Sequence, residues 1–337
     1  MKKSLIALAV LASTGAAMAQ SSVTLYGIID LSYASSKDEI GAGSSAAALR
    51  KTTMDSGTVS GSRYGFKGSE DLGGGLKANF GLENGFAADT GASGTAGQAF
   101  SRASWVGFSG GFGEVRLGKD WTARDEINGA AHSVFDSGLS PDTFLASGYL
   151  ANPGNQIKYL SPNLSGFSGM VSYALGENKT ATKSAQGLAA VNVQYAAGPI
   201  YVGAAYQEDK ITNFSTTGLT MKDALINGSY DLGVAKLMAS YRDTKNTFEG
   251  NDKEKTAQIG VDVPVGAALV LSAGYAHTTK ELAGVADKTG NGFGLGAMYS
   301  LSKRTSIYSG LTFAKLKQDG VEDLKSDRFA VGVRHTF

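Results

Sequence analysis

The sequence lacks several features that would place it in a familiar soluble or helical class. It has no cysteine, which excludes disulfides, thiolate metal sites and a cysteine nucleophile. Its 31 lysines and arginines are nearly balanced by 30 aspartates and glutamates, so it lacks the basic excess of a nucleic-acid-binding protein. After the first residues, no apolar run approaches the roughly 20 residues that a membrane-spanning helix requires.

The start of the chain differs from the rest. Lys2 and Lys3 precede a short apolar run from Leu5 to Ala12, and Ala17-Met18-Ala19 has the small-x-small pattern of a cleavage site. A charged start, an apolar stretch too short to cross a membrane and such a site together predict a secretory signal peptide. We therefore expect residues 1–19 to be removed and residues 20–337 to form a single domain.

The remaining chain is rich in what β-structure uses, with 46 glycines, 14 tyrosines and 15 phenylalanines against only 5 prolines. Apolar residues alternate with polar or small ones in many short segments. One such face carries Val23, Leu25, Gly27, Ile29, Leu31 and Tyr33, and another carries Ala257, Ile259, Val261 and Val263. Segments of about ten alternating residues separated by turns are typical of strands in a membrane β-barrel.

The connections between these segments alternate in length. Seven short ones lie at 70–75, 109–113, 161–166, 197–199, 231–233, 264–268 and 301–304. Eight long ones lie at 35–59, 87–100, 122–152, 176–186, 208–222, 243–255, 278–291 and 315–327. Fifteen connections separate sixteen strands. We predict an all-β, 16-stranded antiparallel transmembrane barrel with short periplasmic turns and long extracellular loops.

Aromatic residues mark both ends of the apolar faces. Those before long connections are Phe86, Tyr206, Tyr241, Tyr275 and Phe313, and those beside short ones are Phe167, Tyr230 and Tyr299. Two such belts match the two interfaces of a membrane barrel. A soluble β-sandwich also alternates, but it gives no reason for aromatic residues to gather at both ends. Sixteen strands would enclose a water-filled lumen.

Several longer motifs resemble the general porins of Gram-negative bacteria, in particular the β-proteobacterial type. They are SSVTLYGIIDLSY near the start, GSRYGFKGSEDLGGGLKANFGLENGF at 61–86, SRASWVGFSGGFGEVRLGK at 101–119, NQIKYLSPNLSGFSG at 155–169 and the terminal RFAVGVRHTF. The resemblance implies a homotrimer in the outer membrane, with a third loop folded into the lumen. It also implies contact with outer-membrane lipids, lipopolysaccharide and the barrel-assembly machinery.

The third long connection, 122–152, is the first candidate for a functional segment. Structureless loops of this length are uncommon unless they serve a function. It carries Arg124, Asp125, Glu126, His132, Asp136 and Asp142, together with the apolar Val134, Phe135, Leu139, Phe144 and Leu145. So many apolar side chains favour a loop packed inside the barrel. The alternative is a solvated surface loop with a small buried cluster.

Alternation also predicts which charges face the lumen. The inward cations are Arg63, Lys67, Lys77, Arg116, Lys158, Lys236, Arg242, Arg328 and Arg334, and the inward anions are Asp30, Glu83, Glu114, Asp231 and Asp262. The candidate pore-lining residues are Arg63, Lys67, Lys77, Glu83, Arg116, Lys158 and Arg334 on the wall, with Asp125, Glu126 and Asp136 on the loop. Opposite charges across a narrow gap set ion preference. Nine wall cations against five anions predict weak anion preference. The alternative is that most of these groups are merely hydrated.

The end of the chain closes the predicted ring. In RFAVGVRHTF, Phe329, Val331 and Val333 point outward, and this strand must pair with the first one, because an unpaired edge is not tolerated in lipid. In the resembled family a terminal phenylalanine is a signal for the insertion machinery. Phe337 is therefore a candidate assembly signal.

The function that these patterns favour is passive diffusion of small hydrophilic solutes and inorganic ions, with no cofactor, metal or enzymatic activity. A substrate-specific channel would need an aromatic track, for which Trp105, Trp121 and Tyr26 are too few. A barrel enzyme built on His335 would need a nucleophile and an orienting group at matching positions, and no spacing supplies them.

Overall fold

The computed structural model describes residues 22–40, 47–177, 179, 181–182, 185–211, 220–247, 252–318 and 321–337. The predicted signal peptide, 1–19, lies outside the described residues. Among the described residues, none of the helical structure is long and apolar enough to cross a membrane.

The described part of the chain is dominated by antiparallel strands. They are β1 (Ser22–Ile40), β2 (Ala47–Ser56), β3 (Arg63–Gly73), β4 (Leu76–Gly85), β5 (Ala103–Gly110), β6 (Gly113–Lys119), β7 (Gln156–Leu160), β8 (Phe167–Leu175), β9 (Gly187–Ala197), β10 (Ile200–Asp209), β11 (Met221–Asp231), β12 (Lys236–Asn246), β13 (Asp252–Val265), β14 (Leu269–Glu281), β15 (Lys288–Ser300), β16 (Thr305–Gln318) and β17 (Val321–Thr336). A short 3₁₀ helix, η1 (Asp125–Ala131), lies between β6 and β7.

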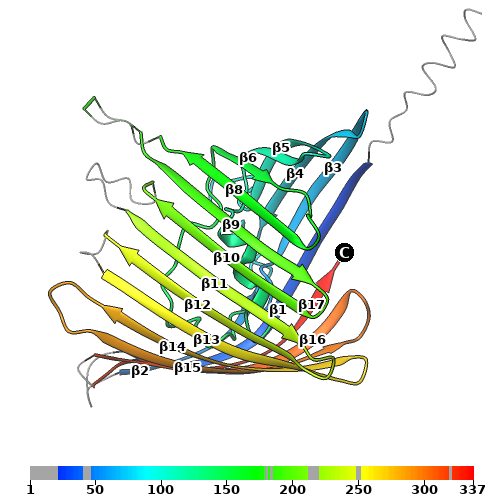
Figure 1. Ribbon diagram of the computed structural model, residues 1–337. Helices are drawn as coiled ribbons and strands as arrows, with labels where there is room; N and C mark the ends of the chain where they lie inside the picture. The colour runs from blue at the N-terminus through cyan, green and yellow to red at the C-terminus, as the bar shows by residue number, and fades with distance from the viewer. Residues whose placement is uncertain are drawn as a thin grey trace, which may run out of the picture.

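All these strands belong to one sheet that closes on itself (Figure 1). Apart from β2 and β3, which both pair with β1, each strand pairs with the next along the chain, and β17 pairs back to β1 over thirteen residue pairs from Ile28↔Thr336 to Ile40↔Leu324. The seventeen elements fill sixteen positions in the ring. β2 and β3 share one position, because β2 pairs with the second half of β1 and β3 pairs with its first half. The predicted closed barrel of sixteen antiparallel strands is confirmed.

The pattern of burial is the reverse of that in a soluble protein, since apolar side chains are exposed on the outside and polar ones are buried inside. On β13, the outward Ile259 is 61% exposed, whereas the inward Gln258 is 3% exposed. The same order recurs on β1, where Val23, Leu25 and Tyr33 are exposed and Ser32 is buried. An apolar exterior around a polar interior is the arrangement of a barrel that faces lipid outside and water inside.

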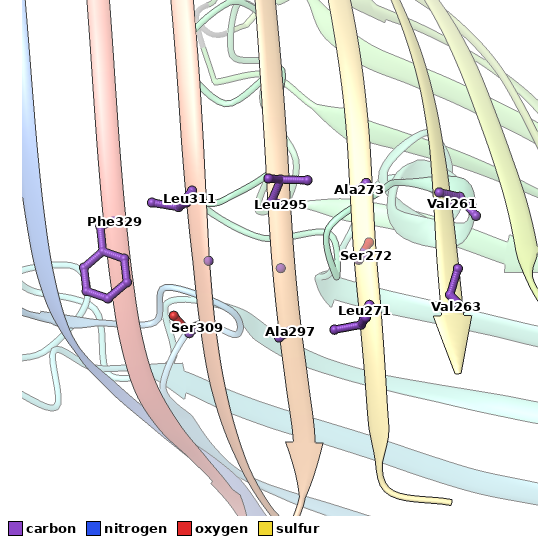
Figure 2. A pocket seen from close by; sticks show the side chains of 12 residues that line it. Val261, Val263, Leu271, Ser272, Ala273, Leu295, Ala297, Ser309, Leu311 and Phe329 are labelled. Carbon is purple, nitrogen blue, oxygen red and sulfur yellow. The ribbon is translucent and has the colours of Figure 1, made fainter. Parts of the chain in front are cut away.

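The outer wall over β13–β17 illustrates this surface. Figure 2 shows Leu271, Leu295 and Leu311 projecting from neighbouring strands. The small side chains of Ala273, Ala297 and Ser309 lie between them and leave a shallow hollow. No charged side chain lines the hollow. Its surface suits acyl chains and carries no group that would recognise a hydrophilic solute.

The seven predicted short turns lie where expected, but four of the predicted long connections are more than half strand. β1 and β2 cover most of 35–59, β12 and β13 most of 243–255, β14 and β15 most of 278–291, and β16 and β17 most of 315–327. Their polar composition was misleading, because these strands extend beyond the apolar band. There, charged side chains pair across strands, as Lys253 and Glu281 do at 2.9 Å.

Candidate functional site

The segment 120–155 between β6 and β7, here called the lumenal loop, lies inside the ring (Figure 1). Wall side chains bond its backbone at successive points around the barrel. The bonds are Ala123 N to Ser172 Oγ (3.0 Å), Asn192 Nδ2 to Ala123 O (2.5 Å), Asn227 Nδ2 to Ile127 O (2.6 Å), Val134 N to Ser272 Oγ (2.9 Å) and Thr312 Oγ1 to Leu139 O (2.8 Å). The partners come from β8, β9, β11, β14 and β16. The loop therefore follows the inner wall and narrows the lumen, as expected for 122–152.

A buried ion cluster fixes the first part of this loop. Arg124 and Asp223 have side chains only 1% exposed, and Arg124 Nε donates to Asp223 Oδ1 at 2.7 Å. Arg242 Nε donates to the other carboxylate oxygen at 2.5 Å. The ring of Tyr149 lies 3.9 Å from the Arg124 guanidinium and 5.2 Å from that of Arg242. Asp223 thus joins two arginines, one on the loop and one on β12, and Tyr149 stacks against both.

Glycines on the wall make room for the middle of the loop. A Cβ at Gly292 would lie 1.8 Å from Pro141 O, and one at Gly294 would lie 2.5 Å from Leu139 O. Both contacts are with backbone, so an alanine would displace the loop.

The loop itself takes the left-handed conformation at Val134, Phe135 and Asp136, with φ of 52°, 66° and 48°. Left-handed backbone is rare for a β-branched residue and persists only where surrounding contacts enforce it.

Titratable groups on the loop are strongly perturbed. Burial lowers the pKa of His132, but Asp142 at 3.0 Å and Asp136 at 3.1 Å outweigh it and raise that pKa to about 10. His132 is therefore a cation at neutral pH. Burial raises the pKa of Asp125 to about 6, although Tyr149 donates to its carboxylate at 2.5 Å. The negative charge of the loop is consequently smaller than its composition indicates.

Three arginines lie near one another on the opposite side of the lumen, and two of them pair with one carboxylate. We call Arg63, Arg102, Arg334 and Glu83 the basic cluster. Arg102 Nε lies 2.6 Å from Glu83 Oε1, and Arg63 Nε lies 3.6 Å from Glu83 Oε2. Arg334 Nε donates to Ser60 Oγ at 2.9 Å. With three guanidinium groups and one carboxylate, the basic cluster has a net charge of +2.

The ring order places the basic cluster and the acidic part of the loop across from each other. Arg63 begins β3, which shares the second of sixteen positions. The helix η1, which carries Asp125 and Glu126, packs on β10, β11 and β12. β11 is the tenth position, eight away from the second, which is half of the ring. Asp125 and Glu126 on η1 therefore lie half a ring away from Arg63.

The other sequence-predicted residues lie in different surroundings. Lys67 is exposed in the lumen over the Tyr26 ring at 5.3 Å. Lys77 is exposed beside the turn that joins β3 and β4. Arg116 pairs with Glu114 at 3.0 Å and with Asp120 at 3.1 Å.

Two further predicted residues contact each other beneath the loop. Lys158 is 1% exposed and pairs with Asp120 at 3.2 Å and with Glu126. Asp136 on the loop is half exposed beside His132.

Asp30, expected to be a hydrated wall anion, is 0% exposed and has no contact with the open lumen. Its carboxylate instead accepts hydrogen bonds within the wall.

Arg102, Arg124 and Asp223 are not among the residues predicted to line the pore, although Arg124 belongs to the charged residues noted on the loop. The side of the wall on which Arg102 lies was ambiguous from alternation, because this residue precedes β5 in an irregular segment. Arg124 and Asp223 are 99 positions apart, and no local pattern links them. Only the opposite charge of two residues at inward positions could have suggested the pair. Within the described residues, no group of three His, Cys, Asp or Glu side chains is arranged to hold a metal ion.

Comparison with known proteins agrees with this geometry. A family model described as Gram-negative porin matches residues 4–319. The chain belongs to this family. Outer membrane porin protein 32 of Delftia acidovorans is 35% identical over 369 residues, and the alignment covers 100% of both chains. The major outer membrane protein P.IB of Neisseria meningitidis is 31% identical over 354 residues, again with 100% of both chains covered.

A solved structure, the anion-selective porin from Comamonas acidovorans, is similar to this porin with a TM-score of 0.79 and 30% identity. The match covers 94% of this chain and 100% of the other. The porin is thus an outer-membrane protein of a Gram-negative bacterium. Its closed barrel and narrowed lumen form a water-filled channel for passive diffusion of small hydrophilic solutes and ions.

Breaking the Arg124–Asp223 pair should loosen the lumenal loop. In Asp223→Asn, two arginines lose their shared carboxylate, and such a loss at a buried pair typically costs about 3–5 kcal/mol. We expect lower resistance to urea in detergent and noisier single-channel current. The matched control is Glu281→Gln, which removes the exposed partner of Lys253 and should change neither. Wild-type stability and quiet current in Asp223→Asn would show that the cluster does not hold the loop.

Proposed function

We propose that this porin is weakly anion-selective and that the basic cluster carries the preference. The supporting observation is that ion pairs neutralise a smaller share of the charge in the basic cluster than on the lumenal loop. The basic cluster has one carboxylate for three guanidinium groups, Arg63, Arg102 and Arg334. The porin with the TM-score of 0.79 is itself described as anion-selective, which favours the same sign here.

The acidic side is partly compensated. Glu126 is paired with Lys158, and the protonated His132 is shared by Asp136 and Asp142, while Asp125 accepts a hydrogen bond from the neutral Tyr149 hydroxyl. A permeating ion therefore meets a positive wall and a loop that keeps only part of its negative charge. Such a field concentrates anions in the narrow zone and still orients dipolar solutes.

We assign the candidate residues to three roles in this channel. Arg63, Arg334 and Lys67 would line the narrow zone with Glu83 and with Asp125 and Asp136 opposite. Arg116, Lys158 and Glu126 would hold the loop against the wall. Lys77 would act at the periplasmic mouth, beside a short turn.

The sign of the preference is testable by reversal potential in planar bilayers under a KCl gradient. We expect a chloride-to-potassium permeability ratio above one at pH 8. At pH 5, below the pKa of about 6 of Asp125, protonation removes one negative charge and the ratio should rise. In water, a unit charge about 10 Å from the ion changes the ion's electrostatic energy by about 0.4 kcal/mol, which corresponds to about a twofold change in the permeability ratio.

The control for this pH dependence is Asp125→Asn, which keeps an acceptor for Tyr149 and cannot titrate. Its ratio should be higher than that of the wild type at pH 8 and should change little between the two pH values. A potassium-selective wild type would contradict the proposal. A wild-type ratio that falls on acidification would contradict the role of Asp125.

The alternatives find less support in the geometry. The aromatic rings that could guide sugars are covered by cations: Arg116 lies 4.1 Å from the Trp105 ring and Arg102 lies 4.8 Å from the Trp121 ring. His335 Nδ1 contacts Thr305 Oγ1 at 2.9 Å, a contact between strand-end side chains. We therefore propose a non-enzymatic, non-specific channel without a cofactor. Saturable current block by one sugar, or lipid hydrolysis by the purified porin, would contradict this.

We further propose a homotrimer. β6 and β7 have only 7 and 5 residues, whereas a strand needs about 9–11 to cross the hydrocarbon region. This low part of the wall is poorly suited to face lipid, and neighbouring copies would cover it. Single-channel records should then close in three equal steps, and two or four equal steps would exclude a trimer.

Phe337 is proposed as the assembly signal read by the barrel-assembly machinery after residues 1–19 are removed. Phe337 N and O each bond Gly27 at 3.1 Å, and its ring occupies the space where a Gly27 side chain would be. Deleting Phe337 should lower the amount of folded porin in outer membranes, where lipids and lipopolysaccharide surround it. The channels that do assemble should keep wild-type conductance. Normal insertion of this variant at high expression would contradict the signal role.

A further inference from the structure

A second segment besides the lumenal loop turns into the barrel. Residues 57–62, here called the Asp30 turn, leave the ring between β2 and β3. Along β1, the pairing with β3 ends at Ile28↔Arg63 and the pairing with β2 begins at Leu31↔Ser56. Thr58, Val59 and Ser62 are buried, so the turn is packed against the wall and does not extend into solvent.

Asp30 holds this turn through both its carboxylate and its backbone. Oδ2 accepts from Val59 N at 3.0 Å and from Ser60 N at 2.7 Å, while Oδ1 accepts from the Tyr308 hydroxyl at 2.5 Å. Its backbone carbonyl accepts from Gly57 N at 2.9 Å. A fully buried carboxylate with three donors is fixed in place, because losing any donor would leave a buried charge underbonded.

The Asp30 turn contacts both the basic cluster and the lumenal loop. Ser60 Oγ accepts from Arg334 Nε at 2.9 Å, and Gly61 O accepts from Arg63 Nη1 at 3.1 Å. Thr58 O accepts from Gly138 N, in the lumenal loop, at 2.8 Å. One six-residue turn therefore contacts two arginines of the basic cluster and the loop that faces them.

Arg334 depends on this turn more than its neighbours do. Arg63 and Arg102 both pair with Glu83, whereas Arg334 forms no ion pair with any residue in the described ranges. Its guanidinium is oriented by Ser60 instead. A long arginine side chain without a partner spreads over many rotamers, and its charge is then no longer concentrated at one position.

We propose that Ser60 and Asp30 are positioning residues for ion selectivity, acting through Arg334. The proposal rests on the anion preference inferred above, but it concerns which residues set it. Asp30 fixes the turn, the turn presents Ser60 Oγ, and Ser60 holds the Arg334 guanidinium at the narrow zone. Neither Ser60 nor Asp30 carries the selectivity by its own charge.

The test is a double-mutant cycle on the permeability ratio from reversal potentials, using Ser60→Ala, Arg334→Gln and the double variant. Arg334→Gln removes a charge and should lower the chloride-to-potassium ratio about twofold. Ser60→Ala should lower it by a smaller factor. Because Ser60 acts through Arg334, the double variant should equal Arg334→Gln alone. Ser168→Ala, at an inward serine of β8 bonded to Gln194, is the matched control and should change nothing.

Asp30→Asn also removes a negative charge, which by itself raises the ratio, so its readout is the coupling to Arg334: the part of its effect that passes through the turn should vanish in the Arg334→Gln background. If Asp30→Asn does not assemble, the Ser60 cycle alone decides. A wild-type ratio in Ser60→Ala, or additive effects in the double variant, would overturn the proposal. A cation-selective wild type would overturn the anion preference, while the coupling between Ser60 and Arg334 would still be measured.

Discussion

The structure depends on one constraint: in lipid every backbone amide and carbonyl must find a partner within the protein. A sheet meets it only by closing, so β17 returns to β1 along thirteen residue pairs. Closure with sixteen positions leaves a lumen too wide to be filled by wall side chains alone. The lumenal loop and the Asp30 turn enter this space, and they leave a channel instead of a packed core.

Segments inside a water-filled lumen cannot rely on a large apolar core to hold them. The loop is held by small apolar clusters, such as Val134 and Leu139 against Ala34, by hydrogen bonds from wall side chains, and by the buried Arg124–Asp223–Arg242 cluster. These attachments also distribute charge. Acidic groups of the loop meet His132, Lys158 and Tyr149, while the basic cluster keeps a net positive charge. Anchoring and selectivity therefore arise from the same set of ion pairs.

The period of two predicted the strands and the inward position of residues such as Arg63 and Glu83, because alternation is a local property, and the alternation of short and long connections predicted the strand number. It could not separate Lys77 at the mouth from Lys158 beneath the loop, since depth and burial depend on contacts distant in sequence. Residues 57–62 were expected partly as an outer loop, because glycine and serine indicate a turn but not its direction. Polar extensions of β1, β13 and β16 resembled loops for the same reason of composition.

In the conducting state the lumenal loop is fixed against the wall at the narrow zone, and a covalent bridge tests this directly. Because the chain has no cysteine, Thr58→Cys with Gly138→Cys introduces the only thiols, at positions joined by the 2.8 Å bond between Gly138 N and Thr58 O. Single-channel conductance is measured before and after oxidation, with cross-linking followed by a gel shift. We expect efficient cross-linking with unchanged conductance. Failure to cross-link, or a large conductance change when the bridge forms, would contradict it.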